Sequence, residues 1–313
     1  MTKINIAVIS GGWSREKDIS IKSGYAVYNA LDKDKYNVTT YDPSRDLELL
    51  IKNRPSIDLA FILLHGRFGE DGCIQGFLNL LSIPFVGSGL ISSAMSSNKK
   101  IAKDAYKLAG LNIIQDVSLK KGEPFSVEKI IDFLGKKTIV KPVSEGSSFG
   151  ISICNSHEEL KKGIESTFTY DNEILIEKFI SGREVTCCVL GNDTLETLPI
   201  VEIQPNSDHN FFDYEAKYTT GASKEICPAP LPHVISEKVK QYAKTAHHAL
   251  RCRTWSRTDM IIFENEVFML ETNTIPGMTE NSLVPLASRA AGLTMSQLLD
   301  KLIDLSLEKI PRF

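Results

Sequence analysis

The chain has 313 residues, of which 42% are hydrophobic and 24% are charged, and its formal net charge is −3. This composition is typical of a globular protein with two or three lobes and excludes a disordered chain. The small net charge excludes a basic field that would attract nucleic acid or an anionic membrane. The start, "MTKINIAVIS", lacks the pattern of a signal peptide, and the longest apolar run, residues 59–64, is too short to cross a bilayer. A cytoplasmic location is therefore expected.

Strands and helices alternate in the first third of the chain. The stretches "INIAVIS" and "DLAFILL" predict buried strands, and a helix is expected from about Glu16 to Leu31. Five apolar residues are expected on the inner face of this helix: Ile19, Ala26, Val27, Ala30 and Leu31. The alternation is typical of a parallel sheet covered on both faces, in which ligands bind beyond the carboxyl ends of the strands. The segments "GGWS" and "HGRFGEDG" fall at those ends.

A second unit is expected to begin with "SSNKKIAKDAYKLAG". Ser97 or Asn98 can cap this helix, and Gly110 can end it. Its inward stripe is expected to be Ile101, Ala102, Ala105, Leu108 and Ala109. Strands are then predicted at "KKTIVKP", "GISIC" and "EILIEKFI", and the capping box Ser156-x-x-Glu159 opens a helix before the last of them.

The last part of the chain is richer in strands. These are predicted at "REVTCCVLG", "LETLPIVEI" and "MIIFENEVFML", and helices are expected at 236–251 and after the capping box Thr294-x-x-Gln297. The long polar and aromatic segment 204–232 has little regular pattern, which indicates a functional loop. The six cysteines have no C-x-x-C spacing, so free thiols are expected rather than a zinc site or disulfides.

The segment "KPVSEGSSFG" has the composition of a phosphate-binding turn. Lys141 stands at a strand end, and the following glycines and serines can offer backbone N–H groups and hydroxyls to an anion. It is not a Walker loop, since no lysine follows the glycines in G-K-[ST] order, and G-x-G-x-x-G is absent. A plain glycine–serine hairpin turn is the alternative.

The segment "RTDMIIFENEVFMLETN" predicts a hairpin that turns around Asn265. If Phe263 pairs with Val267, then Asp259 lies opposite Glu271. Facing carboxylates repel each other unless a cation lies between them. A register shifted by one residue is the alternative, and it would place the two carboxylates on opposite faces.

The same register would place Arg257 opposite Asn273, and it would bring three oxygen donors together. Glu271 and Asn273 are two residues apart on a strand, so their side chains share a face. Two carboxylates and an amide oxygen suit Mg²⁺, and the lack of a neighbouring histidine or thiol argues against zinc. A strand that simply ends in a polar turn is the alternative for "MLETNTIPG".

Eight segments in this order resemble the D-alanine–D-alanine ligases of the ATP-grasp superfamily: "GGWSREKDIS", "LHGRFGEDGCIQG", "VGSG", "VKPVSEGSSFG", "LIEKFISGREVT", "FFDYEAKY", "RTD" and "LETNTIPGMTENSLVP". The resemblance runs nearly end to end. It implies an α/β ATP-grasp fold, with a Rossmann-like N-terminal substrate-binding domain and two α+β ATP-grasp lobes. These would span residues 1–96, 97–180 and 181–313, and the protein would be a homodimer.

The resemblance implies that ATP phosphorylates the carboxylate of one D-alanine and that the amine of a second D-alanine displaces the phosphate. The product, D-alanyl-D-alanine, would serve peptidoglycan precursor synthesis. The implied ATP-binding residues are Lys99, Lys141 and Lys217 at the phosphates, Glu177, Lys178, Phe179 and Ile180 at adenine, and Glu184 at the ribose. The implied ligands of Mg²⁺, or of Mn²⁺ in its place, are Asp259, Glu271 and Asn273.

The remaining implied site residues contact the two D-alanines or close the site. They are Glu16 and His65 at the first substrate, Ser282 and Leu283 at the second, Arg257 and the Gly277 N–H at the oxyanion, and Ser147 with Tyr218 in the loop that covers the site. His65 as general base, and Glu16 as a plain helix-start acid, are further interpretations. Trp13, Asn98 and Phe68 depart from the common family pattern.

Two alternative functions use the same chemistry and differ in the second substrate, which would be D-serine or D-lactate. Tyr218 favours an amine over D-lactate, because the D-lactate enzymes typically carry histidine there. A nucleotide- or amino-acid-binding protein without turnover is a rival from another class, and Arg257, Asp259, Glu271 and Asn273 argue against it. An oxidoreductase function is disfavoured, because the sequence lacks the glycine-rich dinucleotide-binding motif G-x-G-x-x-G.

Overall fold

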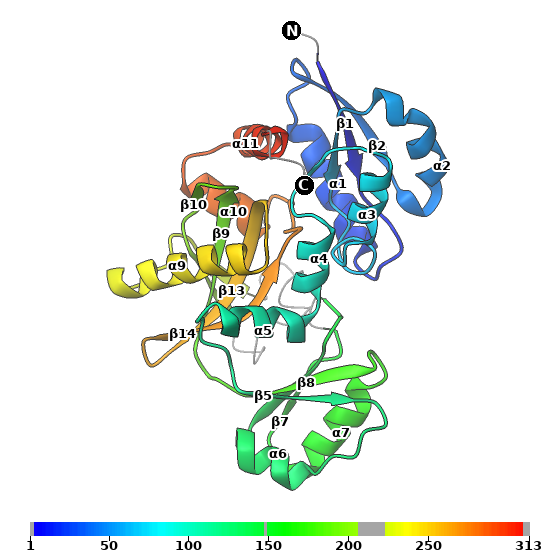
Figure 1. Ribbon diagram of the computed structural model, residues 1–313. Coiled ribbons are helices and arrows are strands. Elements are labelled where there is room, and N and C mark those ends of the chain that lie inside the picture. Colours follow the sequence, from blue (N-terminus) through cyan, green and yellow to red (C-terminus); the bar gives the residue numbers. More distant parts are fainter. Residues whose placement is uncertain (1–2, 147–148, 206–222, 309–313) are drawn as a thin grey trace.

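A parallel four-stranded sheet forms the N-terminal lobe of the computed structural model, which describes residues 3–146, 149–205 and 223–308 (Figure 1). Its strands lie in the order β2 (Tyr36–Tyr41), β1 (Ile4–Ile9), β3 (Leu59–Ile62) and β4 (Phe85–Val86). Residues 6–9 and 59–62 are buried without alternation, as expected for strands covered on both faces. The predicted parallel α/β lobe is confirmed.

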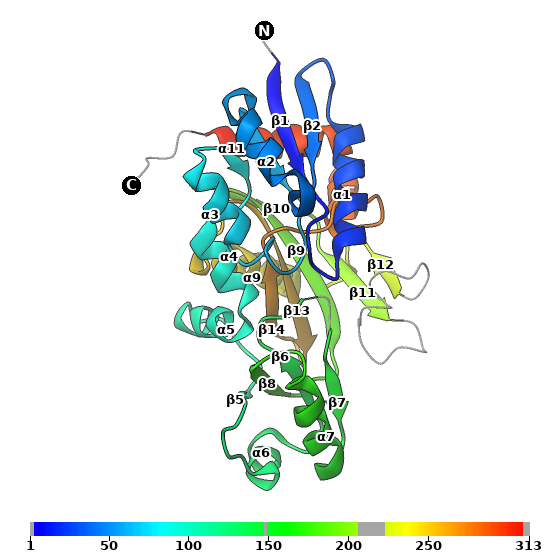
Figure 2. The ribbon, with the colours of Figure 1, turned by 90° about the vertical axis from the view of Figure 1, so that its right-hand side faces the viewer.

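The helices of the first part of the chain are α1 (Lys17–Ala30), α2 (Pro43–Asn53), α3 (Cys73–Leu80), α4 (Leu90–Ser97) and α5 (Lys99–Leu108). Helix α1 covers one face of the sheet, and α2 and α3 cover the other (Figure 2). Helices α4 and α5 lead from this lobe to the rest of the molecule (Figure 1). No helix within the described ranges has the length and apolar character needed to cross a membrane.

The inner face of α1 is more polar than the sequence pattern predicts. Of the five apolar residues expected there, only Val27 and Leu31 are buried. The buried positions of the helix before Val27 are Ser20, Ser23 and Gly24. The prediction is wrong for this part because the helix packs against backbone at the strand ends: the Ser20 hydroxyl donates to a carbonyl just after β3, over 2.6 Å.

The buried face of α5 also differs from its predicted stripe. Asn98 is the N-cap, and its side chain accepts a 3.0 Å hydrogen bond from the Ile101 N–H. Lys103 and Tyr106 are fully buried, whereas Ile101 and Leu108 are 47% and 90% exposed. The predicted stripe is confirmed for Ala102, which is buried, and for Ala105, which packs against the same core, but it is wrong for the exposed Ile101, Leu108 and Ala109. The pattern assigned lysine to solvent, but the Lys103 ammonium forms ion pairs in the interior.

An antiparallel sheet forms the central lobe, with two helices on one face (Figure 1). Its strands lie in the order β5 (Asp116–Lys120), β8 (Glu173–Lys178), β6 (Thr138–Pro142) and β7 (Ser152–Cys154), and its helices are α6 (Val127–Leu134) and α7 (His157–Thr167). Ser156 caps α7 as predicted and accepts from the Glu159 N–H at 3.2 Å. In the predicted capping box the Glu159 carboxylate would accept from the N–H of Ser156. It accepts instead from the N–H of Asn155.

A larger antiparallel sheet forms the C-terminal lobe. Its strands lie in the order β12 (Ser223–Ile226), β11 (Val201–Pro205), β9 (Arg183–Gly191), β13 (Thr254–Phe263) and β14 (Glu266–Asn273), and β10 (Leu195–Thr197) pairs with β9. Its helices are α9 (His233–Ala249), α10 (Leu283–Ala290) and α11 (Met295–Leu307). The predicted capping box of Thr294 and Gln297 opens α11. The segment predicted to be irregular contains β12, and its residues 206–222 lie outside the described part of the chain.

The two faces of this sheet belong to different cores. Adjacent residues of a strand point to opposite faces, and Cys187 and Cys188 of β9 do so. Cys187 packs with residues of α5 and α9, and Cys188 packs with residues of α10, α11 and the N-terminal lobe. All six cysteines are free thiols; four of them are buried, whereas Cys73 is exposed and Cys227 is half-buried.

His247 of α9 is expected to make stability depend on pH. It is buried with its Nδ1 atom 2.8 Å from the Ser256 hydroxyl, and burial lowers the pKa of His247 from 6.5 to about 4. The unfolded chain therefore takes up this proton at higher pH than the folded one. Between these pH values the free energy of unfolding should fall as pH falls, by about 3 kcal/mol in total.

Chemical denaturation of His247→Gln between pH 7 and pH 4 should show that this part of the pH dependence is lost. The exposed His233 of the same helix provides the control, since His233→Gln should keep the wild-type slope. Equal slopes for wild type and His247→Gln would contradict the assignment.

Candidate active site

Two cavities adjoin each other between the lobes. The larger, of about 1040 Å³, is lined by the N-terminal lobe, the start of α5 and the end of β14. The smaller, of about 420 Å³, is lined by the central and C-terminal sheets. Among the described residues, four line both cavities: Lys99, Glu145, Gly146 and Glu271. Molecules held in the two cavities can meet and react with each other at this junction.

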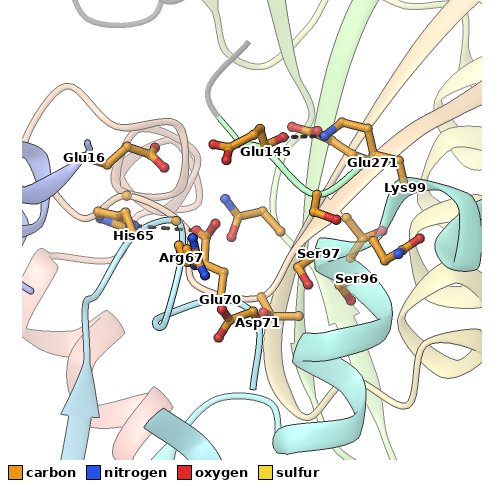
Figure 3. A pocket seen from close by; sticks show the side chains of 18 of the residues that line it. Glu16, His65, Arg67, Glu70, Asp71, Ser96, Ser97, Lys99, Glu145 and Glu271 are labelled. Carbon is orange, nitrogen blue, oxygen red and sulfur yellow. Dashed lines mark hydrogen bonds and ion pairs between the residues drawn. The ribbon is translucent and has the colours of Figure 1, made fainter. Parts of the chain in front are cut away.

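Glu16 and His65 face Lys99 and Glu271 across the larger cavity (Figure 3). Glu16 occupies the N-cap position of α1, but its side chain makes no capping hydrogen bond. A Cβ atom on Gly66, whose φ is +70°, would lie only 2.6 Å from the Glu16 carboxylate. Glycine is therefore needed at this position, and the carboxylate is directed to the cavity rather than to the helix end.

His65 is held from both sides of its ring. Its Nε2 atom lies 3.2 Å from the Ser23 hydroxyl, and its Nδ1 atom lies 3.7 Å from the Glu70 carboxylate. Glu70 lines the larger cavity together with Arg67 and Asp71 (Figure 3). Sequence reasoning assigned these three residues no role, although their place after a strand end in "HGRFGEDG" was a signal.

Trp13 and Phe68, which depart from the family pattern, contact each other outside the cavity. Their rings meet edge to face with centroids 5.6 Å apart, and Trp13 is 51% exposed. Neither residue lines either cavity. The space beside Glu16 is therefore set by other residues.

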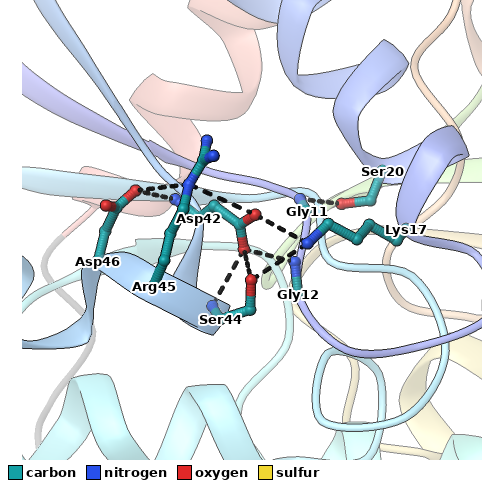
Figure 4. A network of polar contacts seen from close by, with 8 residues as sticks. All are labelled: Gly11, Gly12, Lys17, Ser20, Asp42, Ser44, Arg45 and Asp46. Carbon is teal, nitrogen blue, oxygen red and sulfur yellow. Dashed lines mark hydrogen bonds and ion pairs between the residues drawn. The ribbon is translucent and has the colours of Figure 1, made fainter.

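Asp42 holds the loop between β1 and α1, which leads to Glu16 (Figure 4). Its carboxylate accepts hydrogen bonds from the Gly12 N–H at 2.8 Å and from the N–H and hydroxyl of Ser44. Burial alone would raise the pKa of Asp42, but these hydrogen bonds lower it to about 2. A Cβ on Gly11 would lie 2.5 Å from this carboxylate. Gly11 thus leaves room for the Asp42 carboxylate, and Gly12 binds it through its backbone N–H.

The hairpin of β13 and β14 brings the predicted metal ligands together through a register that was only partly predicted. Asp259 lies opposite Glu271, as expected. The expected pairing of Phe263 with Val267 is wrong, because Phe263 lies opposite Glu266. The tight turn after Phe263 shifts the pairing by one residue.

A β-bulge at Leu270 restores the predicted pairing of the carboxylates. Consecutive residues of β13 pair with Glu271 and then with Met269, so Leu270 has no partner in this ladder. Both Leu270 and Glu271 line the smaller cavity, while Met269 and Thr272 beside them are buried. Bulges commonly redirect side chains next to functional sites. Here the bulge turns Glu271 to the cavity junction.

Arg257 supplies positive charge to the facing carboxylates. Its guanidinium donates to both oxygens of Asp259, at 2.9 and 2.7 Å. The Thr186 hydroxyl donates to the same carboxylate at 2.5 Å. Opposite Arg257, the Asn273 side-chain oxygen accepts from the Ile275 N–H at 2.7 Å, which orients the amide. Two carboxylates and an oriented amide oxygen fit a hard divalent cation that also binds phosphate oxygens.

The start of α10 forms the far end of the larger cavity. Ser282 is the N-cap of this helix, and its hydroxyl lies 3.0 Å from the position of a Cβ on Gly277. The same hydroxyl accepts from the Thr279 N–H at 3.0 Å. Gly277, Ser282 and Leu283 all line the cavity. A helix start with exposed N–H groups suits an anion, such as a carboxylate.

The smaller cavity contains the described residues that the resemblance assigned to the nucleotide: Lys99, Lys141, Glu177, Lys178, Phe179, Ile180 and Glu184. Its walls are partly apolar, from Ile139, Ile151 and Ile261. The Glu177 carboxylate is bound to the ammonium groups of Lys141 and Lys103, each at 2.6 Å. Sequence reasoning missed Lys103. The predicted residues Ser147, Lys217 and Tyr218 lie outside the described residues.

Comparison with known proteins yields one consistent family. Residues 106–304 match the family model "D-ala D-ala ligase C-terminus", and residues 44–88 match "D-ala D-ala ligase N-terminus". The chain is 50% identical over 306 residues to the D-alanine–D-alanine ligase of Syntrophobacter fumaroxidans, with 98% of each chain covered.

Solved structures agree with these sequence matches. The D-alanine–D-alanine ligase of Bacillus anthracis complexed with ATP has a TM-score of 0.86 and 34% identity, with 97% of each chain covered. A D-Ala:D-Ser ligase from Enterococcus faecalis has a TM-score of 0.85 and 33% identity, with 98% of this chain and 100% of that chain covered.

Proposed function

This chain belongs to the D-alanine–D-alanine ligase family, and we propose how its residues divide the steps of the reaction between them. The protein has the ATP-grasp fold and catalyses the ATP-dependent joining of two D-alanines for cell-wall synthesis. A carboxylate resists an amine nucleophile until one of its oxygens becomes a leaving group. ATP provides that leaving group by phosphorylating the first D-alanine, so the protein must position charged groups and neutralise charge.

The junction of the two cavities carries this proposal. ATP occupies the smaller cavity, where Lys141 binds phosphate oxygens and the connector of residues 177–180 holds adenine. The ribose lies at Glu184. Lys99 lies at the junction, so its ammonium can bind the terminal phosphate where that phosphate meets the larger cavity. Lys217 is proposed as a further phosphate contact.

The larger cavity binds the two D-alanines. Glu16 holds the ammonium of the first molecule beside His65, and the first carboxylate then points to Lys99 at the junction (Figure 3). Ser282 and the N–H of Leu283 bind the second carboxylate at the start of α10.

Stabilisation of the oxyanion is assigned to two donors at this end of the cavity. Arg257 and Gly277 both line the larger cavity, and we assign the guanidinium and the Gly277 N–H to the oxyanion that forms when the second amine attacks the acyl phosphate. Ser147 and Tyr218 are proposed to close the site against water, because water would hydrolyse the acyl phosphate.

The divalent metal that the family uses is proposed to be Mg²⁺, with Mn²⁺ as a substitute, held by Asp259, Glu271 and Asn273. Their oxygen-only donor set and the facing carboxylates support this assignment. When bound, the metal neutralises charge on the transferring phosphate. We further propose a cytoplasmic homodimer with lobes at 1–96, 97–180 and 181–313.

A coupled assay of phosphate release tests the function. Release should require ATP, Mg²⁺ and D-alanine together, should stop with EDTA, and should return with Mg²⁺ or Mn²⁺ but not with zinc at equal concentration. The product should be D-alanyl-D-alanine, and mixtures with D-serine or D-lactate should yield much less mixed product. L-Alanine is the matched control. Folded protein that binds ATP but releases no phosphate with D-alanine would contradict the proposal.

A further inference from the structure

Lys103 is a buried cation that lines neither cavity, yet it is bound to the nucleotide site. It lies one turn after Lys99 on α5 and is 2% exposed. Its ammonium contacts the Glu177 carboxylate and the Ile114 carbonyl, each at 2.6 Å, and the Asp116 carboxylate at 2.8 Å. An ammonium has three N–H donors, and three oxygens lie within 2.8 Å of this one.

The partners of Lys103 share one face of the central sheet. Asp116 of β5 lies directly opposite Glu177 of β8. Lys141 of β6 lies two residues from the position opposite Glu177, so its side chain is on the same face. Like charges directly opposite each other destabilise a sheet. The Lys103 ammonium lies between the two carboxylates and removes that repulsion.

The two oxygens of Glu177 are divided between two lysines. Oε1 binds Lys103 and Oε2 binds Lys141, each at 2.6 Å. Burial alone would raise the pKa of Glu177, but the charges of Lys141 and Lys103 hold it below its usual value. Glu177 thus stays ionised and holds the Lys141 ammonium at the wall of the smaller cavity.

We propose that Lys103 is a positioning residue of the nucleotide site, which balances Asp116 and Glu177 so that the charge of Lys141 remains effective toward phosphate. The four groups carry two positive and two negative charges. Without Lys103 the group would be net negative beside a polyanionic ligand, and Lys141 would be its single cation. The inference rests on the proposed contact of Lys141 with the ATP phosphates.

The charge balance predicts a specific pattern of KM values. Lys103→Met should raise the KM for ATP about tenfold or more and should change the KM for D-alanine less than about twofold. Adding Asp116→Asn to this variant restores neutrality, so the KM for ATP should return to within about threefold of wild type. Asp116→Asn alone should leave the KM for ATP unchanged or lower it.

A matched control separates this role from a structural one. Leu134→Ala removes a buried side chain from the core of the same lobe, so it should lower the Tm without raising the KM for ATP. The inference is overturned if folded Lys103→Met keeps the wild-type KM for ATP, or if the second substitution gives no recovery. If Lys103→Met does not fold, Asp116→Asn decides, since a raised KM for ATP would contradict the charge balance.

A wrong proposed function would give different experimental results from a wrong role of Lys103. Wild type would then release no phosphate with D-alanine, or Lys141→Met would keep the wild-type KM for ATP. Normal wild-type activity with an unaffected Lys103→Met variant would reject only the role of Lys103.

Discussion

Glu271→Gln is expected to lower kcat about a thousandfold. The side chain lies where the two cavities meet, and the substitution keeps its size while removing its charge. Charge neutralisation by a metal is worth several kcal/mol in a phosphoryl-transfer transition state, and each 1.4 kcal/mol is about tenfold in rate. The Mg²⁺ concentration that gives half-maximal activity should rise as well. Phosphate release across a Mg²⁺ titration measures both effects.

The same hairpin provides a matched control for this prediction. Glu266 is an exposed residue of β14 that pairs with Lys238 and lines neither cavity. Glu266→Gln makes the identical chemical change and should leave kcat within about twofold, as is usual for exposed ion pairs. A Glu271→Gln enzyme with an unaltered Mg²⁺ dependence would refute the assignment of Glu271 as a metal ligand.

Arg257→Met is expected to separate catalysis from metal binding. Loss of one oxyanion donor typically costs about 10² to 10³ in kcat. The guanidinium also pairs with both oxygens of Asp259, so its removal frees that carboxylate from a competing cation. The variant should therefore need less Mg²⁺ for half-maximal activity although its kcat is much lower. Steady-state kinetics at several Mg²⁺ concentrations reveal this opposite pair of changes.

Arg289→Met serves as the control for this second prediction. Arg289 is an exposed arginine of α10 whose guanidinium donates to the Glu280 carbonyl. Its loss should change neither kcat nor the Mg²⁺ requirement by more than about twofold. A rise in the Mg²⁺ requirement of Arg257→Met would mean that Arg257 supports the metal site rather than competing for Asp259.

The general architecture could be predicted because the local sequence pattern of most strands and helices agrees with their place in the tertiary structure. The continuous apolar runs of β1 and β3 indicate strands buried on both faces, and the structure has a parallel sheet at that place. The capping residues Asn98, Ser156 and Thr294 mark helix starts correctly. In each case the signal lies within a few residues of the feature.

The errors occur where contacts between distant segments decide the outcome. On α5 the pattern placed Lys103 outside, because nothing local shows that Asp116 and Glu177 meet it in the interior. On α1 the pattern favoured apolar residues, but Ser20 and Ser23 are buried against backbone and His65. A periodic pattern of apolar residues predicts which hydrophobic side chains are buried. It does not predict the burial of polar side chains whose hydrogen bonds are satisfied in the interior.

In the hairpin of β13 and β14, the correct prediction that Asp259 lies opposite Glu271 rested on a wrong detail. The predicted register began with a false pair at the turn, and the unforeseen bulge at Leu270 compensated for it. A bulge adds one residue to one strand, so period-two counting cannot find it. The family resemblance, by contrast, depends on the residue types themselves and placed Asp259 and Glu271 in the site independently of that count.

Asp259, Glu271 and Asn273 are proposed to hold one divalent cation at the junction of the two cavities. The most direct measurement is a crystal structure with Mn²⁺ and a non-hydrolysable ATP analogue, using the anomalous signal of manganese to locate the ion. We expect an anomalous peak about 2.2 Å from oxygens of these three side chains and of the terminal phosphates. A peak bound elsewhere, with these side chains contacting no ion, would contradict the claim.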